Sequence, residues 1–396
     1  MELLTRDEVE SRLRRLRQWM AEASVDAVFA MQNVDLFYFS GTIQAGLLCL
    51  PVKGEPLYLV QKSPARARME SPWQRIVPIG SLKEAPGALS DAGICGLGRV
   101  GLELDVLPVI QFQRLQSIFP SVAFIDASEA IRKVRMIKSA HELVQIRNAA
   151  LMLREAFSEL PRWARPGATE IEVAGNLEGF LRSRGHQGIT RARGFNFELG
   201  YGALVCGPSA SYPTCFPGPL GSEGLYPAVP HGAGRRPLAA GQTVMADVVG
   251  GYGGYLADKT RTFALGDVPV ELFRAHGFVL ELMGEIESMI RPGTPCSQIY
   301  EHALERVRRS PYAASFMGVG DSQVRFIGHG VGLEIDELPV LAMGFDMPLE
   351  PGMVIAIEPK IFFPEGGVGI ENTYLVTESG YEKLTEFPEG MIALPA

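Results

Sequence analysis

The stretch QTVMADVVGGYGGYLADKTRTF, from Gln242 to Phe263, holds two β-rich runs on either side of a glycine cluster. Glycines between two such runs are typical of a hairpin turn. If the turn centres between Tyr252 and Gly253, Asp247 and Asp258 lie directly opposite each other. Opposite side chains are only about 4.5–5.5 Å apart at Cβ, where two like charges destabilise the pair. The sequence therefore predicts a positive group between these aspartates.

A second stretch, MVIAIEPKIFFPEGGVGIENTYLV from Met353 to Val376, repeats the arrangement. A turn centred between Pro364 and Glu365 sets Glu358 opposite Glu371. Both registers assume ladders without bulges, because one extra residue shifts a strand. Four carboxylates on facing strands can avoid mutual repulsion by protonation, by pairing with Arg or Lys, or by holding cations.

The stretch GHGVGLEIDELP, from Gly328 to Pro339, places His329 between two glycines, seven residues before Asp336. Such a pattern is typical of a glycine turn before a buried strand, or of a ligand whose small neighbours let a metal or substrate approach. The four carboxylates favour the ligand. One imidazole among carboxylate oxygens suits two divalent ions such as Mn, Co, Fe or Zn. Two such ions can activate a water and polarise a carbonyl, so metal-assisted hydrolysis is the expected reaction.

The composition indicates a globular protein large enough for two domains, with 396 residues of which 46% are hydrophobic and 21% charged. A net charge of -8 without a basic run argues against a nucleic-acid partner. The N-terminal segment is charged and lacks a signal-peptide core, and no segment approaches the roughly 18 apolar residues that cross a bilayer. The five cysteines lack CxxC spacing and are expected to be reduced thiols. We therefore expect a cytoplasmic protein without a membrane partner.

The first third of the chain alternates helix and strand signals, which predicts an α/β domain. Its expected strands are VDAVFAM, EPLYLVQ, VGLELD and VAFIDA. A capping box of Ser139 and Glu142 then opens a long helix, AHELVQIRNAALMLREAFSEL. We place the boundary so that residues 1–133 form the first domain and residues 134–396 the second.

The second domain contains a weak internal repeat. ARPGATEIEVAGNLEGFLRSRG, from Ala164, and IRPGTPCSQIYEHALERVRRS, from Ile290, share Arg-Pro-Gly followed by a capped amphipathic helix. Each helix precedes a strand-rich segment with a carboxylate at its centre. The first copy is longer, and its surplus falls in CGPSASYPTCFPGPLGSEG, a glycine- and proline-rich loop from Cys206 to Gly224.

Four of these stretches, DVVGGYGGYLADKTRTF, GHGVGLEIDELP, PGMVIAIEPK and GVGIENTYLVTE, resemble signatures of the pita-bread metallopeptidases. That family includes prolidase, Xaa-Pro aminopeptidase and methionine aminopeptidase, with creatinase as a metal-free relative. The resemblance covers nearly the whole chain. It implies a creatinase/prolidase-like α/β N-terminal domain, then an α+β pita-bread catalytic domain with an internal pseudo-twofold repeat. It also implies a homodimer that hydrolyses the N-terminal bond of short peptides, including the Xaa-Pro type.

The resemblance further implies a role for particular residues. Asp247 would chelate one ion, Asp258 and Glu371 would bridge both, and His329 with Glu358 would bind the second. Glu358 also matches the carboxylate assigned to proton transfer. His231 matches a histidine near the substrate. The remaining histidines are expected to have no chemical role: His141, His186, His276 and His302.

Three departures from the family pattern concern the substrate. Asp336 stands where the peptidases usually carry His, and Gly369 where prolidases often carry Arg. The Cys206–Gly224 loop can reshape the pocket near His231. We expect Asp336 to bind an NH or cationic group of the substrate or, alternatively, to pair with a nearby Arg or Lys. The alternative functions are a lyase or amidohydrolase acting on a small amide-like metabolite, and a binding protein on the same scaffold.

Overall fold

The computed structural model describes residues 3–395, and the chain separates into two units, Met1–Arg135 and Met136–Ala396. The sequence placed the boundary after residue 133. Helix α6 (Ser128–Met136) runs through both positions, so the periodic pattern of the sequence does not mark a break there. None of the helices in residues 3–395 has the length and apolar character of a membrane span.

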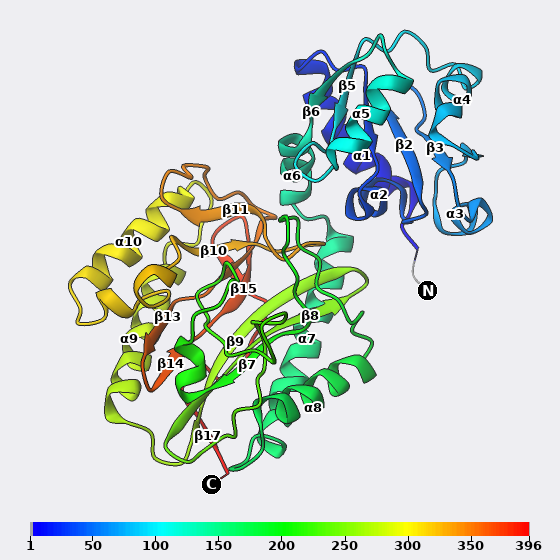
Figure 1. Cartoon of the computed structure of the whole chain (residues 1–396). Helices are drawn as coiled ribbons and strands as arrows, with labels where there is room; N and C mark the ends of the chain where they lie inside the picture. Colours follow the sequence, from blue (N-terminus) through cyan, green and yellow to red (C-terminus); the bar gives the residue numbers. More distant parts are fainter. Residues whose placement is uncertain (1–2, 396) are drawn as a thin grey trace. The chain divides into compact units, whose positions relative to one another are not determined.

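The N-terminal unit is an α/β domain around one six-stranded sheet with the order β4-β3-β2-β1-β5-β6 (Figure 1). Three pairs are parallel: β3 with β4, β1 with β5, and β5 with β6. Strand β2 is antiparallel to both of its neighbours, β1 and β3. The strands are β1 (Ala27–Ala30), β2 (Gly46–Pro51), β3 (Leu57–Val60), β4 (Ile76–Pro78), β5 (Arg99–Leu102) and β6 (Ala123–Asp126). The helices before α6 are α1 (Arg6–Glu22), α2 (Asn33–Ser40), α3 (Pro64–Glu70), α4 (Ala85–Asp91) and α5 (Val109–Ile118). All four expected strands are present, as β1, β3, β5 and β6, whereas β2 and β4 were missed.

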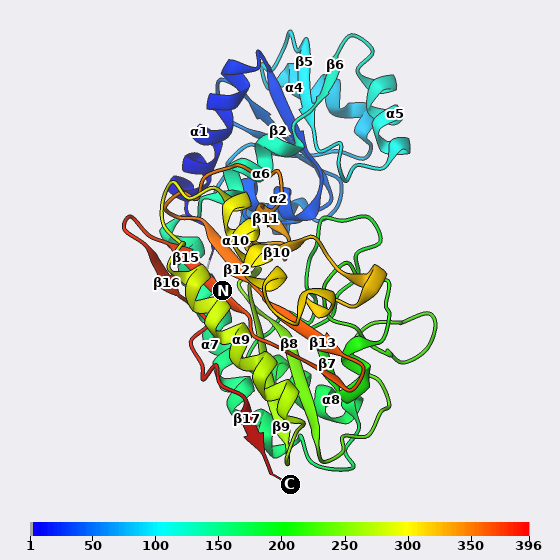
Figure 2. The same ribbon diagram turned by 90° about the vertical axis from the view of Figure 1, so that its left-hand side faces the viewer.

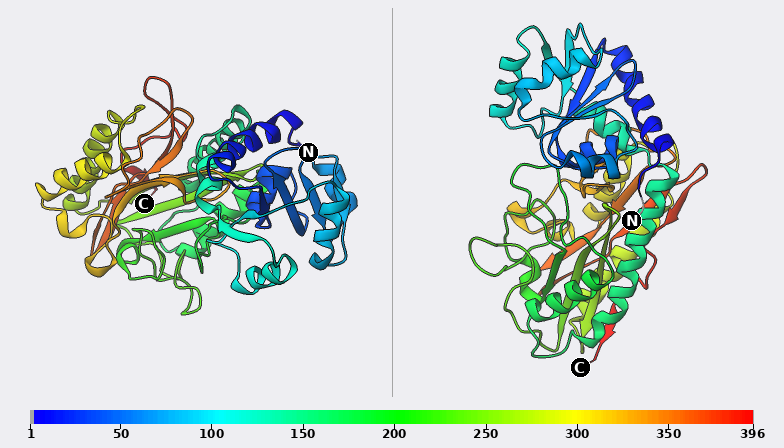
Figure 3. Two further views of the ribbon diagram at one scale, coloured as in Figure 1. Left: turned by 90° about the horizontal axis from the view of Figure 1, so that it is seen from above. Right: turned by 90° about the vertical axis from the view of Figure 1, so that its right-hand side faces the viewer.

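The C-terminal unit holds its strands between two pairs of helices (Figure 1). Helix α7 packs on β8 and β9 and α8 on β7, whereas α9 packs on β13 and β14 and α10 on β11. Figure 2 is viewed from the α9 side, and the right panel of Figure 3 from the α7 and α8 side. The helices are α7 (Ala140–Glu159), α8 (Glu170–Ser183), α9 (Val270–Glu287) and α10 (Cys296–Arg308). This is the pita-bread arrangement with its internal repeat.

Three sheets make up this unit, with the orders β17-β9-β8-β7, β11-β10-β12-β15-β16 and β13-β14. The strands of the first half are β7 (Gly202–Cys206), β8 (Gln242–Tyr252) and β9 (Tyr255–Leu265). Those of the second half are β10 (Phe326–Gly330), β11 (Glu337–Ala342), β12 (Val354–Ile357), β13 (Lys360–Phe363), β14 (Gly366–Gly369), β15 (Asn372–Val376), β16 (Tyr381–Lys383) and β17 (Ile392–Leu394).

Helix starts follow the sequence signals in two of three cases. The capping box of Ser139 and Glu142 forms at the start of α7. In the first repeat, Thr169 and Glu172 cap α8 in the same reciprocal way. In the second repeat, α10 follows Pro295, which makes no side-chain cap. The expectation of a cap was therefore wrong for the second repeat, because the residue at the N-cap position has no hydrogen-bonding side chain.

The predicted register of the first hairpin was wrong. Gly253 and Gly254 form a two-residue turn in which both have positive φ, 59° and 92°, a conformation that glycine adopts at little cost. Asp247 consequently pairs with Thr260, and Asp258 lies opposite Val249. Because Asp258 and Thr260 are two residues apart on one strand, the two aspartates still share a face of the sheet.

The register of the second hairpin was predicted correctly. Lys360 pairs with Gly369 in the β13–β14 ladder, and Ile357 pairs with Asn372 in the β12–β15 ladder. Both ladders keep the same register, so Glu358 and Glu371 face each other at the break between them.

Candidate metal centre and active site

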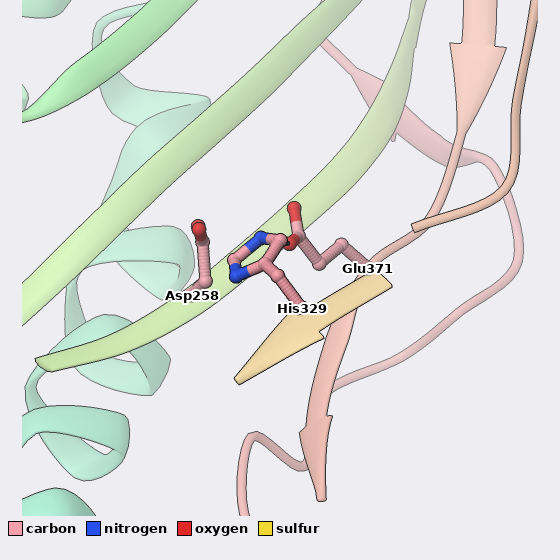
Figure 4. A group of neighbouring side chains, drawn as sticks. All are labelled: Asp258, His329 and Glu371. Carbon is pink, nitrogen blue, oxygen red and sulfur yellow. Dashed lines mark ion pairs between the residues drawn. The ribbon is translucent and has the colours of Figure 1, made fainter. Parts of the chain in front are cut away.

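The predicted carboxylates and histidine come together in two groups that share Glu371. In the first group, one ligand atom each from Asp258, His329 and Glu371 lies within 4.8 Å of the others (Figure 4). Asp247, Glu358 and Glu371 form the second group, with the same limit. Ligands at about 2.0–2.2 Å from one ion are at most about 4.4 Å apart, so a small closure would bring either group to coordination distance.

The two acidic side chains of the first group are held by hydrogen bonds between β9 and the chain leading into β15. The Thr373 hydroxyl donates to the Asp258 carbonyl and accepts from the Asp258 N–H, both at 2.9 Å. The Glu371 N–H donates to the Thr260 carbonyl at 3.1 Å. These bonds align Asp258, on β9, with Glu371, in the segment between β14 and β15.

His329 presents one ring nitrogen to the carboxylates. Its Nδ1 lies 3.2 Å from the Gly330 carbonyl, and a carbonyl only accepts, so Nδ1 carries the proton. Nε2 then has a free lone pair, 3.7 Å from Glu358 Oε1 and 3.9 Å from Glu371 Oε1. Burial lowers the pKa of His329, but Asp336, Glu358 and Glu371 outweigh burial and raise it above its ordinary value.

The glycines beside His329 serve the sheet and not the ligand. A Cβ at Gly328 would lie 2.3 Å from the Ala356 carbonyl oxygen, and one at Gly330 would lie 2.2 Å from the Leu338 oxygen. Strands β12 and β11 approach β10 too closely for any side chain there. The expectation that these glycines leave room for a metal or substrate was therefore wrong, although His329 itself lies where it was expected.

Burial dominates the protonation of the acidic cluster. It raises the pKa of Glu371 to about 7, and it also raises the pKa of Glu358. The pKa of Asp258 is held well above its usual range by burial and by the neighbouring Glu371. Oε1 of Glu371 is buried and has no hydrogen-bond partner among residues 3–395. Buried carboxylates with an unpartnered oxygen and a facing imidazole lone pair fit a divalent cation.

Sequence reasoning missed one functional group, the ammonium of Lys360. Its Nζ lies 3.0 Å from Asp247 Oδ2, 2.5 Å from Glu358 Oε2 and 3.4 Å from Glu371 Oε2. Burial lowers the pKa of Lys360, but these carboxylates together outweigh burial and hold it well above its ordinary value. The available signal was a lone charge at the start of the apolar run KIFF, two residues after Glu358.

An apolar cavity of about 250 Å³ opens onto both groups. Its apolar lining includes Phe197, Leu199, Phe216, Leu220, Phe326, Ile335 and Val340. Part of the Cys206–Gly224 loop thus covers the site, as its position near His231 suggested. The His231 ring stacks on Phe216 with centroids 4.0 Å apart. Burial lowers the pKa of His231 to about 4, and its Nδ1 is without a hydrogen-bond partner in the described chain.

Asp336 also lines this cavity, with a side chain that is 47% exposed. Its Oδ1 lies 3.5 Å from His329 Nδ1. Asp336 makes no ion pair with Arg or Lys among residues 3–395, so that alternative was wrong. Of the other histidines, His186 and His276 contact backbone carbonyls, and His302 contacts Glu285.

The fold is that of a pita-bread metallopeptidase. Residues 144–378 match the model of metallopeptidase family M24, and residues 12–137 match that of the creatinase/prolidase N-terminal domain. The chain therefore belongs to metallopeptidase family M24 and is a metal-dependent peptidase. Membership of this family implies divalent metal ions and a peptide substrate.

Known relatives match over almost their whole length. The Xaa-Pro dipeptidase of Pyrococcus furiosus is 28% identical over 382 residues, covering 96% of this chain and 98% of the relative. Among solved structures, an Xaa-Pro dipeptidase from Bacillus anthracis has a TM-score of 0.82 at 26% identity, covering 98% and 100% of the two chains. The prolidase of Pyrococcus horikoshii has a TM-score of 0.81 at 24% identity, covering 96% and 100%.

Proposed function

We propose that this enzyme removes the N-terminal residue from short peptides, with dipeptides of the Xaa-Pro type among its substrates. The observation that supports this most directly is a small apolar cavity above a buried set of carboxylates and an imidazole. A cavity of about 250 Å³ suits the side chains of a dipeptide better than those of a long peptide. The names of the relatives agree with such substrates.

Five residues are assigned to the metal centre in this proposal: Asp247, Asp258, His329, Glu358 and Glu371. Bound divalent ions at such a centre lower the pKa of a water and polarise the substrate carbonyl. Oxygen ligands with one imidazole suit Mn, Co, Fe or Zn, and the metal available in the cell helps to decide among them. Two ions per chain are what the family resemblance implies.

The remaining roles belong to side chains that border the cavity. Glu358 is buried with a raised pKa, so it can take a proton from water and return it to the leaving amine. His231 stays neutral near pH 7, and its unpartnered Nδ1 can hydrogen-bond a peptide group of the substrate. Asp336 is half exposed beside His329, where it can bind the α-amino group of a peptide.

The proposal extends to the assembly and location of the enzyme. A homodimer follows from the resemblance to the family. Five cysteines without a disulfide agree with the reducing cytoplasm.

Hydrolysis of a dipeptide library by protein loaded with Mn or Co tests the proposed activity. We expect cleavage of peptides with a free amino terminus, Xaa-Pro dipeptides included. The Glu358→Gln variant, which keeps the size of the side chain but cannot transfer the proton, is expected to lose about 100-fold or more in kcat. Failure of the metal-loaded protein to cleave any peptide would contradict the proposal and favour a small amide-like metabolite as substrate.

A further inference from the structure

The side chain of Lys360 ends inside the second carboxylate group. Its Nζ is within 3.4 Å of an oxygen from each of Asp247, Glu358 and Glu371, which are all the members of that group. The lysine side chain is fully buried, so water does not screen these contacts. The ammonium therefore lies where the oxygens that would coordinate an ion converge.

The backbone of the second hairpin makes room for this lysine. Lys360 begins β13 directly opposite Gly369 on β14. A Cβ at Gly369 would lie 2.4 Å from Lys360 Cγ, so a larger residue at 369 would force the lysine side chain to move. Gly369 is also the position where prolidases often carry Arg. The positive charge at this point of the hairpin therefore comes from the facing strand.

The first group remains open to an ion. Asp258 forms no ion pair with Lys or Arg in the described part of the chain. Oε2 of Glu371 accepts from Thr260 at 2.8 Å and faces Lys360, whereas Oε1 lies on the His329 side without a partner. The two oxygens of Glu371 thus face different groups: Oε2 faces the ammonium, and Oε1 faces His329.

The count of charges does not by itself decide between one ion and two, because each case leaves one charge unbalanced, and the repulsion between neighbouring cations decides. The four carboxylates Asp247, Asp258, Glu358 and Glu371 carry four negative charges when ionised. The ammonium with one divalent ion supplies three positive charges, whereas the ammonium with two divalent ions supplies five. A second ion would also share its oxygen ligands with the ammonium, and like charges at such distances in a buried site repel strongly.

We infer that this chain holds a single divalent ion between Asp258, His329 and Glu371, and that the Lys360 ammonium replaces the second ion between Asp247, Glu358 and Glu371. This inference rests on the proposed metal centre and changes its stoichiometry. Asp247 then binds the lysine and does not bind a metal.

Metal counting by equilibrium dialysis against Mn²⁺ tests the inference in the full-length protein. We expect one equivalent per chain for the wild type, and two for Lys360→Met, which is unbranched and one atom shorter than lysine and removes the charge. Lys259→Met is the matched control, because Lys259 is a buried lysine whose Nζ contacts Phe157, Phe387 and the Glu386 carbonyl and none of the cluster. The control is expected to keep one equivalent.

The electron paramagnetic resonance spectrum of the Mn-loaded wild type gives an independent answer if a variant does not fold. An isolated ion gives an uncoupled six-line signal, whereas two ions bridged by Glu371 give an exchange-coupled spectrum. Two equivalents in the wild type, or a folded Lys360→Met variant that stays at one, would overturn the inference and leave the peptidase activity standing. One equivalent without hydrolysis of any peptide would support the inference and contradict the proposed function.

Discussion

Thr260 and Glu371 are joined by two hydrogen bonds that connect β9 to the segment before β15. The Thr260 hydroxyl donates to Glu371 Oε2 at 2.8 Å, and the Glu371 N–H donates to the Thr260 carbonyl at 3.1 Å. This pair fixes one carboxylate oxygen and directs the other toward His329. Outer hydrogen bonds of this kind commonly set the affinity of a metal site.

Replacing Thr260 should therefore weaken metal binding without removing a ligand. We expect Thr260→Val to bind Mn²⁺ about 10–100-fold more weakly, as measured by competition with a chelating dye. Thr243→Val is the control, because the Thr243 hydroxyl is buried and donates to the Gly367 carbonyl at 2.9 Å, away from the cluster. If both variants lost the same affinity for Mn²⁺, the hydrogen bond of Thr260 would stabilise the fold without any specific effect on the metal site.

Loss of Asp258 should abolish metal binding and peptide hydrolysis together. Because its carboxylate is buried beside other carboxylates, Asp258→Ala should also unfold at no lower a temperature than the wild type. We expect metal affinity and kcat/KM to fall by more than about 100-fold. Asp267→Ala removes an exposed carboxylate just after β9 and should change neither. Turnover retained by Asp258→Ala would refute its role as a ligand.

Truncation of Phe216 should weaken the binding of apolar substrates. The ring forms part of the cavity wall and stacks on His231. A lost aromatic contact of about 0.5–1.5 kcal/mol corresponds to a rise in KM of up to about tenfold with little change in kcat. Phe195→Ala, at a ring that is 95% exposed, serves as the control in steady-state kinetics. A loss confined to kcat would instead show that Phe216 acts by positioning His231.

The Asp336→Asn substitution separates two ways in which this side chain can act. If Asp336 binds the α-amino group of the substrate, peptides with a free amino terminus should lose about 10–100-fold in kcat/KM, and N-acetylated peptides should lose little. If it acts through His329, the affinity for Mn²⁺ should fall, and kcat/KM should fall equally for every substrate. We expect the first result, because the half-exposed carboxylate borders the cavity. Unchanged kinetics and affinity would contradict both roles.

Acid should destabilise the catalytic unit through buried histidines. Burial lowers the pKa of His186 to about 4, from about 6.5 in the unfolded chain. The unfolded chain therefore binds a proton that the folded chain does not, so this contribution is complete above about pH 6.5 and is lost as the pH falls to about 4. As the pH falls over this range, the free energy of unfolding of the wild type should drop by on the order of 2 kcal/mol more than that of His186→Gln. Urea denaturation measures this difference. The prediction fails if the free energy of unfolding depends on pH in the same way in the wild type and in His186→Gln.

Much of the fold could be predicted because its signals are local. Short apolar runs marked four strands of the N-terminal unit, and Ser139 with Glu142 marked the start of α7. The turn at Pro364 and Glu365 gave the correct register, whereas the turn at Gly253 and Gly254 did not. Several glycines surround the first turn, so the sequence offers more than one possible centre, and backbone geometry selects among them.

The sequence by itself determined four strands of the N-terminal sheet, the two hairpins, and that Asp247, Asp258, His329, Glu358 and Glu371 lie together. Only the tertiary structure decided what lies between them. The position of Lys360 depends on its pairing with Gly369 and on the packing of that hairpin near β8. Strand periodicity is fixed by neighbouring residues, but the electrostatic partner of a buried carboxylate is fixed by segments far apart in the chain. That is why the acidic cluster was predictable and its lysine was not.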